Sequence, residues 1–202
     1  KNGINIKIEP NYIMRGSLFE PVTLPISSVV ANLYNMEIEC KCLSKADLFG
    51  GKICAALDRQ HPRDLFDIYQ FLKNDNWDEQ ITEAFIFYLI SHNRPIHELI
   101  KPNIQPIMSI FKSEFLGMTR QKITINELES ARAELITKIN NVFSDVNKEF
   151  LVSIASGSPN WNLYSYPKIK DWPSVKWKLL NINKMGKTKK ERQVLELKKV
   201  LN

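Results

Sequence analysis

The sequence has no apolar run long enough for a membrane helix. Its longest apolar stretch, Ala84–Ile90, is far shorter than the roughly 18 residues that a span requires. No basic-then-apolar leader opens the sequence. The three cysteines, Cys40, Cys42 and Cys54, form no Cys-x-x-Cys pair, which argues against a disulfide framework and against a zinc knuckle. We therefore expect a protein of a reducing, cytoplasmic setting with no membrane partner.

Several common catalytic motifs are also absent. The sequence contains no G-x-S-x-G, no Walker A loop and no G-x-G-x-x-G. Its three histidines, His61, His92 and His97, have neither metal-ligand nor triad spacing. The length of 202 residues and the hydrophobic content of 44% fit one globular core, or one core with a small lobe.

Two stretches near the N-terminus have the period-two alternation of β-strands, Ile4–Ile8 and Met36–Cys42. The second stretch places Cys40 and Cys42 on its apolar face, where we interpret them as core filler. The stretch Arg15–Pro25 has two prolines and little periodicity, so we expect a loop there. Two strands alone make an unstable sheet, and the sequence begins in mid-pattern, so we expect further strands upstream of Lys1.

The pattern becomes helical beyond Ser44, which forms a capping arrangement with Asp47. His61-Pro62 ends the first helix and begins the next. Capping-box signatures occur at Thr124-x-x-Glu127 and Thr188-x-x-Glu191. Further expected helices cover 78–91, 105–116, 127–142, 145–155, 174–184 and 189–201. The sequence therefore predicts an α+β fold, with part of a small mixed sheet followed by a mainly helical C-terminal region.

The positive charge is concentrated at the C-terminal end. The net charge is +6, but residues 161–202 contain eleven Lys or Arg against three acids, a balance of +8. Clustered Lys and Arg are typical of surfaces that contact nucleic-acid phosphates. A solvated basic helix that binds nothing explains the pattern equally well.

Trp161, Trp172 and Trp177 are interleaved with lysines in this basic end. Such mixing suits stacking on bases together with phosphate contacts. It is also typical of helix-start packing, so we interpret the tryptophans as core and the lysines as facing solvent or nucleic acid. The candidate nucleic-acid contacts are Lys176, Lys178, Lys184, Lys187, Lys189 and Lys190.

Lys52 stands among small and apolar residues of a helix, after Gly50-Gly51 and before Ile53-Cys54-Ala55-Ala56. Small neighbours let a ligand approach closely, and a lysine there can serve as a point charge for phosphate. Helical spacing puts Arg59 on the same face. A lysine that extends from the edge of the core to solvent explains the same pattern, and spacing alone favours that interpretation.

A second cluster comprises Arg63, Asp64 and Asp67 at the start of the next helix. Asp64 and Asp67 share a face, and an acid in a first helical turn is favoured by the helix dipole. With Arg59, these residues make either a catalytic cluster or an ion-pair network between two helices. Spacing alone favours the network.

The first predicted strand carries Lys7 and Glu9 on its polar face. A carboxylate on a sheet beside other acids is how proteins hold Mg²⁺ for nucleotidyl transfer. No such acids occur nearby in the sequence, so the local pattern favours a solvent-facing Glu9.

The segment Asp47–Asp67 resembles the AbiEii/AbiGii family of nucleotidyltransferase-like toxins, found in bacterial abortive-infection (phage-defence) and type IV toxin–antitoxin systems. The matching elements are Lys52, Arg59 and the cluster Arg63-Asp64-x-x-Asp67. The tail is similar to the family's C-terminal helical region at Phe150-Leu151, Pro159-Asn-Trp161 and Trp172–Asn181. The resemblance thus spans essentially the whole chain.

The resemblance implies a nucleotidyltransferase fold, with residues 1–75 the rear part of that domain and 76–202 a helical domain with a basic tail. It implies transfer of a nucleotide from an NTP to an acceptor, with tRNA the leading candidate, Mg²⁺ as cofactor and a cognate antitoxin as a partner to look for. It makes Lys52 and Asp64 the catalytic candidates. The nucleotide-binding candidates are Lys52, Lys7, Arg59 and Arg63, and Glu9 is the candidate metal ligand.

Family members hold Mg²⁺ with an upstream Gly-Ser/Thr and Asp-x-Asp motif, and these 202 residues contain no Asp-x-Asp. We therefore expect the rear part of a larger enzyme, and we expect that these residues alone transfer no nucleotide. Two alternatives stay open. One is a non-catalytic module that binds RNA or an antitoxin, and the other is a remnant with no activity.

Overall fold

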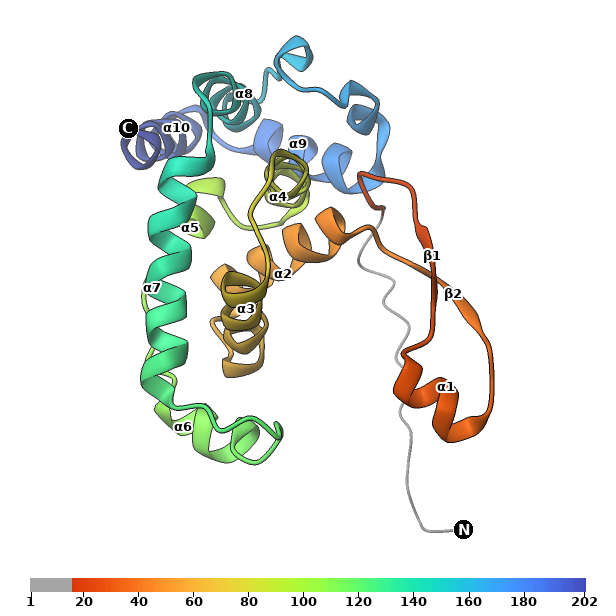
Figure 1. Cartoon of the computed structure of the whole chain (residues 1–202). Helices are drawn as coiled ribbons and strands as arrows, with labels where there is room; N and C mark the ends of the chain where they lie inside the picture. Colours follow the sequence, from red (N-terminus) through yellow and green to blue (C-terminus); the bar gives the residue numbers. More distant parts are fainter. Residues whose placement is uncertain (1–15) are drawn as a thin grey trace.

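The computed structural model describes residues 16–202, in which a short two-stranded sheet precedes a set of helices (Figure 1). This arrangement confirms the α+β class predicted from the sequence. The predicted strand Ile4–Ile8, with Lys7 and Glu9, lies outside the described residues. The division of the chain near residue 75 stays a prediction.

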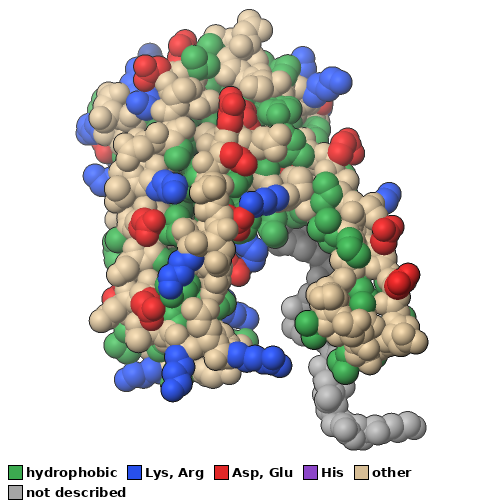
Figure 2. Space-filling view, in the orientation of Figure 1, with side chains coloured by type: hydrophobic (Ala, Val, Ile, Leu, Met, Phe, Trp, Pro, Cys, Tyr) green, Lys and Arg blue, Asp and Glu red, His purple; other side chains and the backbone are tan. Residues whose placement is uncertain are grey.

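The two strands belong to an arm that lies to one side of the helices, drawn in red and orange in Figure 1. Strand β1 (Val22–Pro25) pairs antiparallel with β2 (Glu39–Cys42), and helix α1 (Ser28–Tyr34) connects them. The arm is open to solvent, and Figure 2 shows apolar side chains on its surface. Its exposed large apolar residues are Val22, Leu24, Val29, Val30, Leu33, Tyr34, Met36 and Ile38.

The arm corrects two predictions. The expected loop Arg15–Pro25 contains β1, because Val22 and Leu24 alternate with Thr23 and an edge strand tolerates a proline such as Pro25 at its end. The interpretation of Cys40 and Cys42 as core filler is wrong, since Cys40 is exposed and Cys42 half-buried in an arm that stands apart from the core. The predicted strand Met36–Cys42 is confirmed for its second half only.

Three consecutive helices form the centre of the fold: α2 (Lys45–Arg59), α3 (Pro62–Asn74) and α4 (Glu79–Ser91). Every residue of α4 from Ile81 to Ile90 is buried, so α4 is the core helix. Helix α2 packs directly on α4. Gly50 permits this close approach, because a Cβ at that position would lie 2.9 Å from the backbone of Ala84.

The remaining helices surround this centre. Helix α7 packs on α3, and α10 packs on α8 and α5 (Figure 1). A π-helical turn, η1, continues directly from α6, and two short 3₁₀ turns, η2 and η3, precede α9. These elements are α5 (Ile96–Ile100), α6 (Met108–Ile110), η1 (Phe111–Phe115), α7 (Ile125–Val142), α8 (Asp145–Ser156), η2 (Trp161–Leu163), η3 (Pro167–Asp171), α9 (Pro173–Lys184) and α10 (Lys187–Leu201).

Local signals located most helix ends correctly. Ser44 caps α2, and the capping box of Thr124 with Glu127 starts α7, as predicted. The capping box predicted at Thr188 is wrong, because α10 begins at Lys187 with Gly186 as its N-cap. The helix predicted over 105–116 is present only in the later part of that range, as α6 and η1. Gln105 is held in a loop, since its N–H donates to Gln60 Oε1 at 3.0 Å and its carbonyl accepts from Arg132 at 2.8 Å.

Candidate functional site

The candidate site lies at the corner where α2 ends and α3 begins. Gln60 ends α2 in the left-handed conformation, with φ of 50°. His61 is the N-cap of α3, and its Nδ1 accepts the backbone N–H of Arg63 at 3.1 Å. Pro62 then occupies a first-turn position, where its missing N–H is not needed. This tight connection brings the two helices within side-chain reach of each other.

The buried amide of Gln60 fixes the corner to the rest of the molecule. Its Nε2 donates to the carbonyl of Asn103 at 2.7 Å. Its Oε1 accepts from Arg132 Nη1 at 3.0 Å and from the N–H of Gln105 at 3.0 Å. A buried network whose members are satisfied in this way is rigid, so the corner presents its outward side chains from a fixed frame.

Two ion pairs bridge the helices at this corner. Lys52 Nζ lies 2.6 Å from Asp67 Oδ2, and Arg59 Nη2 lies 2.6 Å from Asp64 Oδ1. The structure therefore brings four predicted residues together. It confirms the predicted ion pairing for Arg59, Asp64 and Asp67, but within residues 16–202 the partner of Asp67 is Lys52 and not Arg63. Lys52 and Asp64 share the corner, although each is paired with another residue. Arg63, on the first turn of α3, is exposed.

The exposure of these pairs determines what they can bind. The side chain of Arg59 is 62% exposed and that of Lys52 35%, whereas Asp64 is only 14% exposed. A solvent-accessible ion pair contributes only about 0–1 kcal/mol to stability, so an incoming anion can replace the carboxylate as partner. Phosphate oxygens suit both cations, since Arg offers a two-pronged donor and Lys a point charge.

The same residues do not complete a magnesium site. Within residues 16–202, no three His, Cys, Asp or Glu side chains are grouped so that they could hold a metal ion. Asp64 and Asp67 are each paired with a cation, which competes with a metal for their oxygens. Glu9, the predicted metal ligand, lies outside the described residues.

A cavity of about 780 Å³ opens beside the corner, between α2, α4 and the start of α9. Arg59 lines this cavity as well as pairing with Asp64, so the cavity and the corner adjoin. The wall combines aromatic, small and polar side chains. The lining residues are Gly16, Gly51, Cys54, Ala55, Asp58, Arg59, Phe87, Tyr88, Ser91, His92, Asn93, Ser174 and Trp177.

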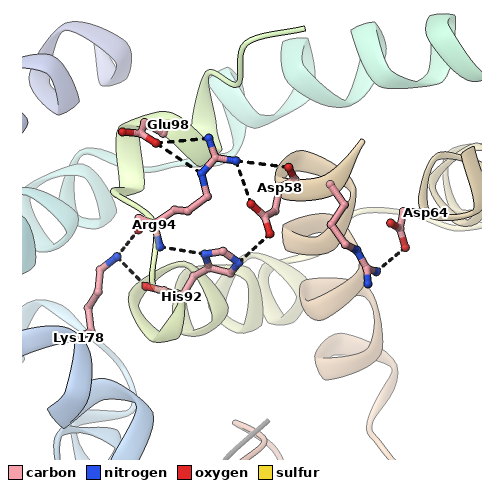
Figure 3. A network of polar contacts seen from close by, with 7 residues as sticks. Asp58, Asp64, His92, Arg94, Glu98 and Lys178 are labelled. Carbon is pink, nitrogen blue, oxygen red and sulfur yellow. Dashed lines mark hydrogen bonds and ion pairs between the residues drawn. The ribbon is translucent and has the colours of Figure 1, made fainter. Parts of the chain in front are cut away.

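A polar network extends from the cavity wall into the molecule (Figure 3). The Asp58 carboxylate accepts from Arg94 Nη1 at 2.9 Å and lies 3.4 Å from His92 Nε2. Arg94 also pairs with Glu98 at 3.3 Å. Lys178 of α9 donates to the backbone carbonyl of His92 at 2.7 Å and to that of Arg94. No sequence pattern predicts this network, because its members come from α2, the connection between α4 and α5, α5 and α9, with no common spacing.

The network favours binding over proton transfer or nucleophilic attack. His92 Nδ1 accepts the N–H of Arg94 at 3.2 Å while Nε2 faces Asp58, so both ring nitrogens are engaged. Burial lowers the pKa of His92. Burial also raises the pKa of the Cys54 thiol, which disfavours the reactive thiolate. We therefore assign His92 and Cys54 a structural role in the cavity wall and not a catalytic one.

A comparison with known protein families decides the identity of the chain. The family model described as nucleotidyl transferase AbiEii toxin, type IV TA system, matches residues 1–178 of the 202. The chain belongs to the AbiEii family. The match contains the corner, the cavity and the Asp58 network, and it ends before α10. No curated protein and no solved structure matches the chain.

Membership confirms the resemblance found at Lys52–Asp67 and makes the chain a nucleotidyltransferase-like toxin of the type IV toxin–antitoxin class. The AbiEii chain also has no described helix that is both long and apolar enough to cross a membrane. The family relationship implies a nucleotide substrate, for which the corner and the cavity are the candidate site.

The basic end of this AbiEii chain differs in two places from the prediction. Lys178 is buried, and its amino group is bound to two carbonyls, so it is not available as a phosphate contact on the surface. Burial lowers its pKa to about 8. Trp177, interpreted as core, is 56% exposed, whereas Trp161 and Trp172 pack against the core as predicted.

The other predicted lysines of α9 and α10 lie at the surface. Four of them, Lys176, Lys184, Lys187 and Lys189, are exposed, and Lys190 is half-buried. Lys187 and Lys190 line a surface groove of about 510 Å³ together with Lys198. Nucleic-acid contact by these lysines stays a prediction.

Proposed function

We propose that this AbiEii chain handles the substrates of nucleotidyl transfer from an NTP to an RNA acceptor, with tRNA the first acceptor to test. The observation that carries the proposal is the placement of Lys52 and Arg59. Both cations stand on α2 in ion pairs that solvent reaches, so a phosphate can replace the carboxylate as their partner. Beside them lies a cavity of about 780 Å³, a volume in the range of small-molecule sites.

In this proposal Lys52 and Arg59 hold the phosphates of the nucleotide, and the exposed Arg63 adds a third positive charge from the first turn of α3. Asp64 is the acidic candidate of the site. When phosphate draws Arg59 away, the Asp64 carboxylate is free to accept a hydrogen bond from an acceptor hydroxyl. Asp67 holds Lys52 in position when no nucleotide is bound.

We further propose that the 202 residues bind the nucleotide without transferring it. The sequence contains no Asp-x-Asp pair, and residues 16–202 form no complete magnesium site. The test is incubation of the chain with labelled NTPs, Mg²⁺ and total tRNA. Label transferred to RNA contradicts this part of the proposal.

Nucleotide binding is tested directly by equilibrium dialysis with labelled ATP. Lys52→Met removes one charge-assisted contact and should weaken binding roughly ten-fold or more. Lys45→Met is the matched control, because Lys45 is also on α2 and forms an ion pair with Asp75 at the end of α3. An equal loss of ATP affinity in the two variants would show that Lys52 affects binding only by joining α2 to α3, and not by contacting the nucleotide.

A second candidate function is that of an RNA-binding module without chemistry. The exposed lysines of α9 and α10 support it, because such clusters attract phosphates without sequence preference. Binding of tRNA by a chain that shows no affinity for any NTP would favour this alternative. A cognate antitoxin is the further partner to seek, in the cytoplasm where NTPs and tRNA are present.

A further inference from the structure

Trp177 presents an indole ring to solvent at the mouth of the cavity. It is 56% exposed, whereas Trp172 packs edge-on against Phe87 with ring centroids 5.1 Å apart. Trp161 is likewise packed against Phe150 at 5.6 Å. An exposed indole leaves a large flat apolar surface in water, and base stacking is a favourable use of such a surface.

The cavity behind Trp177 has the chemistry that a nucleobase requires. Phe87 and Tyr88 of α4 give it an aromatic wall, while Ser91, Asn93 and Ser174 supply hydroxyl and amide groups. A base has two apolar faces and an edge of hydrogen-bond donors and acceptors. A site with aromatic walls and a few polar groups matches both properties.

The charge at the mouth of the cavity suits the phosphate that a base carries. Arg59 lines the cavity and is largely exposed. Asp58, the acid in the lining, does not oppose an anion strongly, because its carboxylate is neutralised by Arg94 at 2.9 Å and faces His92. The cavity thus has a cation on the side that adjoins Lys52.

The position of Trp177 is fixed by its neighbour in the sequence. Lys178 points into the protein and donates to the carbonyls of His92 and Arg94, as Figure 3 shows. Since adjacent residues of a helix point in directions about 100° apart, this anchor sets the rotation of α9 that turns Trp177 outward. The stacking surface is therefore held in place before a ligand arrives.

We propose that a nucleobase enters this cavity and stacks on Trp177 while its phosphate pairs with Arg59. The inference rests on the proposed function and names the part of the site that recognises the base. The ligand is a nucleotide unit, which is supplied either by a free NTP or by the terminal nucleotide of an RNA strand.

The experiment measures the affinity of the 202-residue chain for three ligands: ATP, inorganic triphosphate and a short single-stranded RNA. Trp177→Ala should weaken binding of ATP or of the RNA by about 5- to 100-fold, the range expected for loss of one base–aromatic stack. Trp177→Phe should retain much of the affinity because it keeps an aromatic face. Triphosphate has no base, so its affinity should not change in either variant.

Two further variants complete the test. Arg59→Met should weaken ATP and triphosphate binding alike. Leu180→Ala is the control for loss of an exposed apolar side chain from α9, since Leu180 is 44% exposed, and it should change nothing. A loss confined to ATP assigns the cavity to the NTP, and a loss confined to RNA assigns it to the acceptor end.

Unchanged affinity of Trp177→Ala for both ATP and RNA overturns the inference, as does an equal loss for triphosphate. Either result, with normal dependence on Lys52, leaves the proposed function standing. Conversely, ATP binding that depends on Trp177 but not on Lys52 defeats the proposed phosphate site and leaves the stacking site intact.

Discussion

The amino group of Lys52 and the carboxylate of Asp67, 2.6 Å apart, join α2 to α3 at the face where we place the nucleotide phosphates. Their side chains are 35% and 39% exposed, so water screens the attraction and the pair adds little to stability. Asp67 and a phosphate therefore compete for the same cation. The ion pair keeps Lys52 extended along the corner until a stronger anion replaces Asp67.

This competition predicts opposite effects for the two partners. Asp67→Asn removes the competing charge and should raise the affinity for inorganic triphosphate severalfold, whereas Lys52→Met should lower it. Both substitutions should change the free energy of unfolding by less than about 1 kcal/mol. Calorimetric titration and urea unfolding measure the two quantities. A lower triphosphate affinity in Asp67→Asn would contradict the competition.

The lysines at the surface of α10 predict a salt-dependent affinity for tRNA. Replacing Lys187, Lys189 and Lys190 with Ala should reduce the slope of log affinity against log salt concentration by roughly 2–3 units, one for each lost phosphate contact. The control is the triple replacement of Lys101, Lys112 and Lys122, which are also exposed but lie outside α9 and α10. An unchanged slope in the first variant means that α10 does not contact phosphate.

Two neighbouring glycines of α2 should respond differently to Ala. A Cβ on Gly50 would meet the backbone of Ala84 at 2.9 Å, so Gly50→Ala should lower the free energy of unfolding by about 1–3 kcal/mol. A Cβ on Gly51 would lie an ordinary 3.6 Å from the Tyr88 ring, and Ala favours a helix over Gly by about 1 kcal/mol. Gly51→Ala should therefore be neutral or stabilising. Urea unfolding of both variants compares them, and equal stability would contradict the close α2–α4 contact.

Glu83 predicts a loss of stability as the pH rises. It is buried on α4, its Oε2 has no hydrogen-bond partner in the described chain, and burial together with the charge of Glu79 raises its pKa to about 7. The folded protein therefore holds a proton that the unfolded chain releases above its ordinary pKa near 4.5. The stabilising contribution is complete below that pH and is lost as the pH rises through 7.

Unfolding free energies measured between pH 4 and 8 check this sign. The wild-type protein should lose on the order of 2 kcal/mol relative to Glu83→Gln over this window. Glu79→Gln removes the neighbouring charge and should lower the pKa of Glu83 only slightly, because burial is the larger cause. The loss of stability should therefore start at the same pH and end at a slightly lower pH than in the wild type. Parallel curves for wild type and Glu83→Gln would show that Glu83 does not titrate in this range.

The helices were predictable because their signals are local. Ser44 and Thr124 cap the helices that follow them, and apolar periodicity marks the faces of α3 and α7. Strand β1 was missed because Pro21 precedes it, Pro25 is its last residue, and its pairing partner lies beyond α1. The acids and cations of the corner were located because both helices are adjacent in the sequence.

The environments of Trp177 and Lys178 were predicted the wrong way round. A lysine bonded to two carbonyls is buried, and the tryptophan beside it is exposed. Which of two adjacent residues faces inward depends on the rotation of α9 about its axis. That rotation is set by contacts with residues 92 and 94, which no pattern within α9 reveals.

The order of the helices along the chain has a consequence for how the molecule folds. Helices α2, α3 and α4 are consecutive, and each begins at a side-chain cap, Ser44, His61 and Asp78. Contacts between sequence neighbours close small loops and form rapidly, so this segment is the expected folding nucleus. Helix α9 joins it through contacts between residues far apart in the sequence, among them Ser174 with Ser91 and Lys178 with the carbonyl of His92. We therefore expect the corner to form before the cavity beside it closes, and amide hydrogens in α4 should exchange more slowly than those in α9.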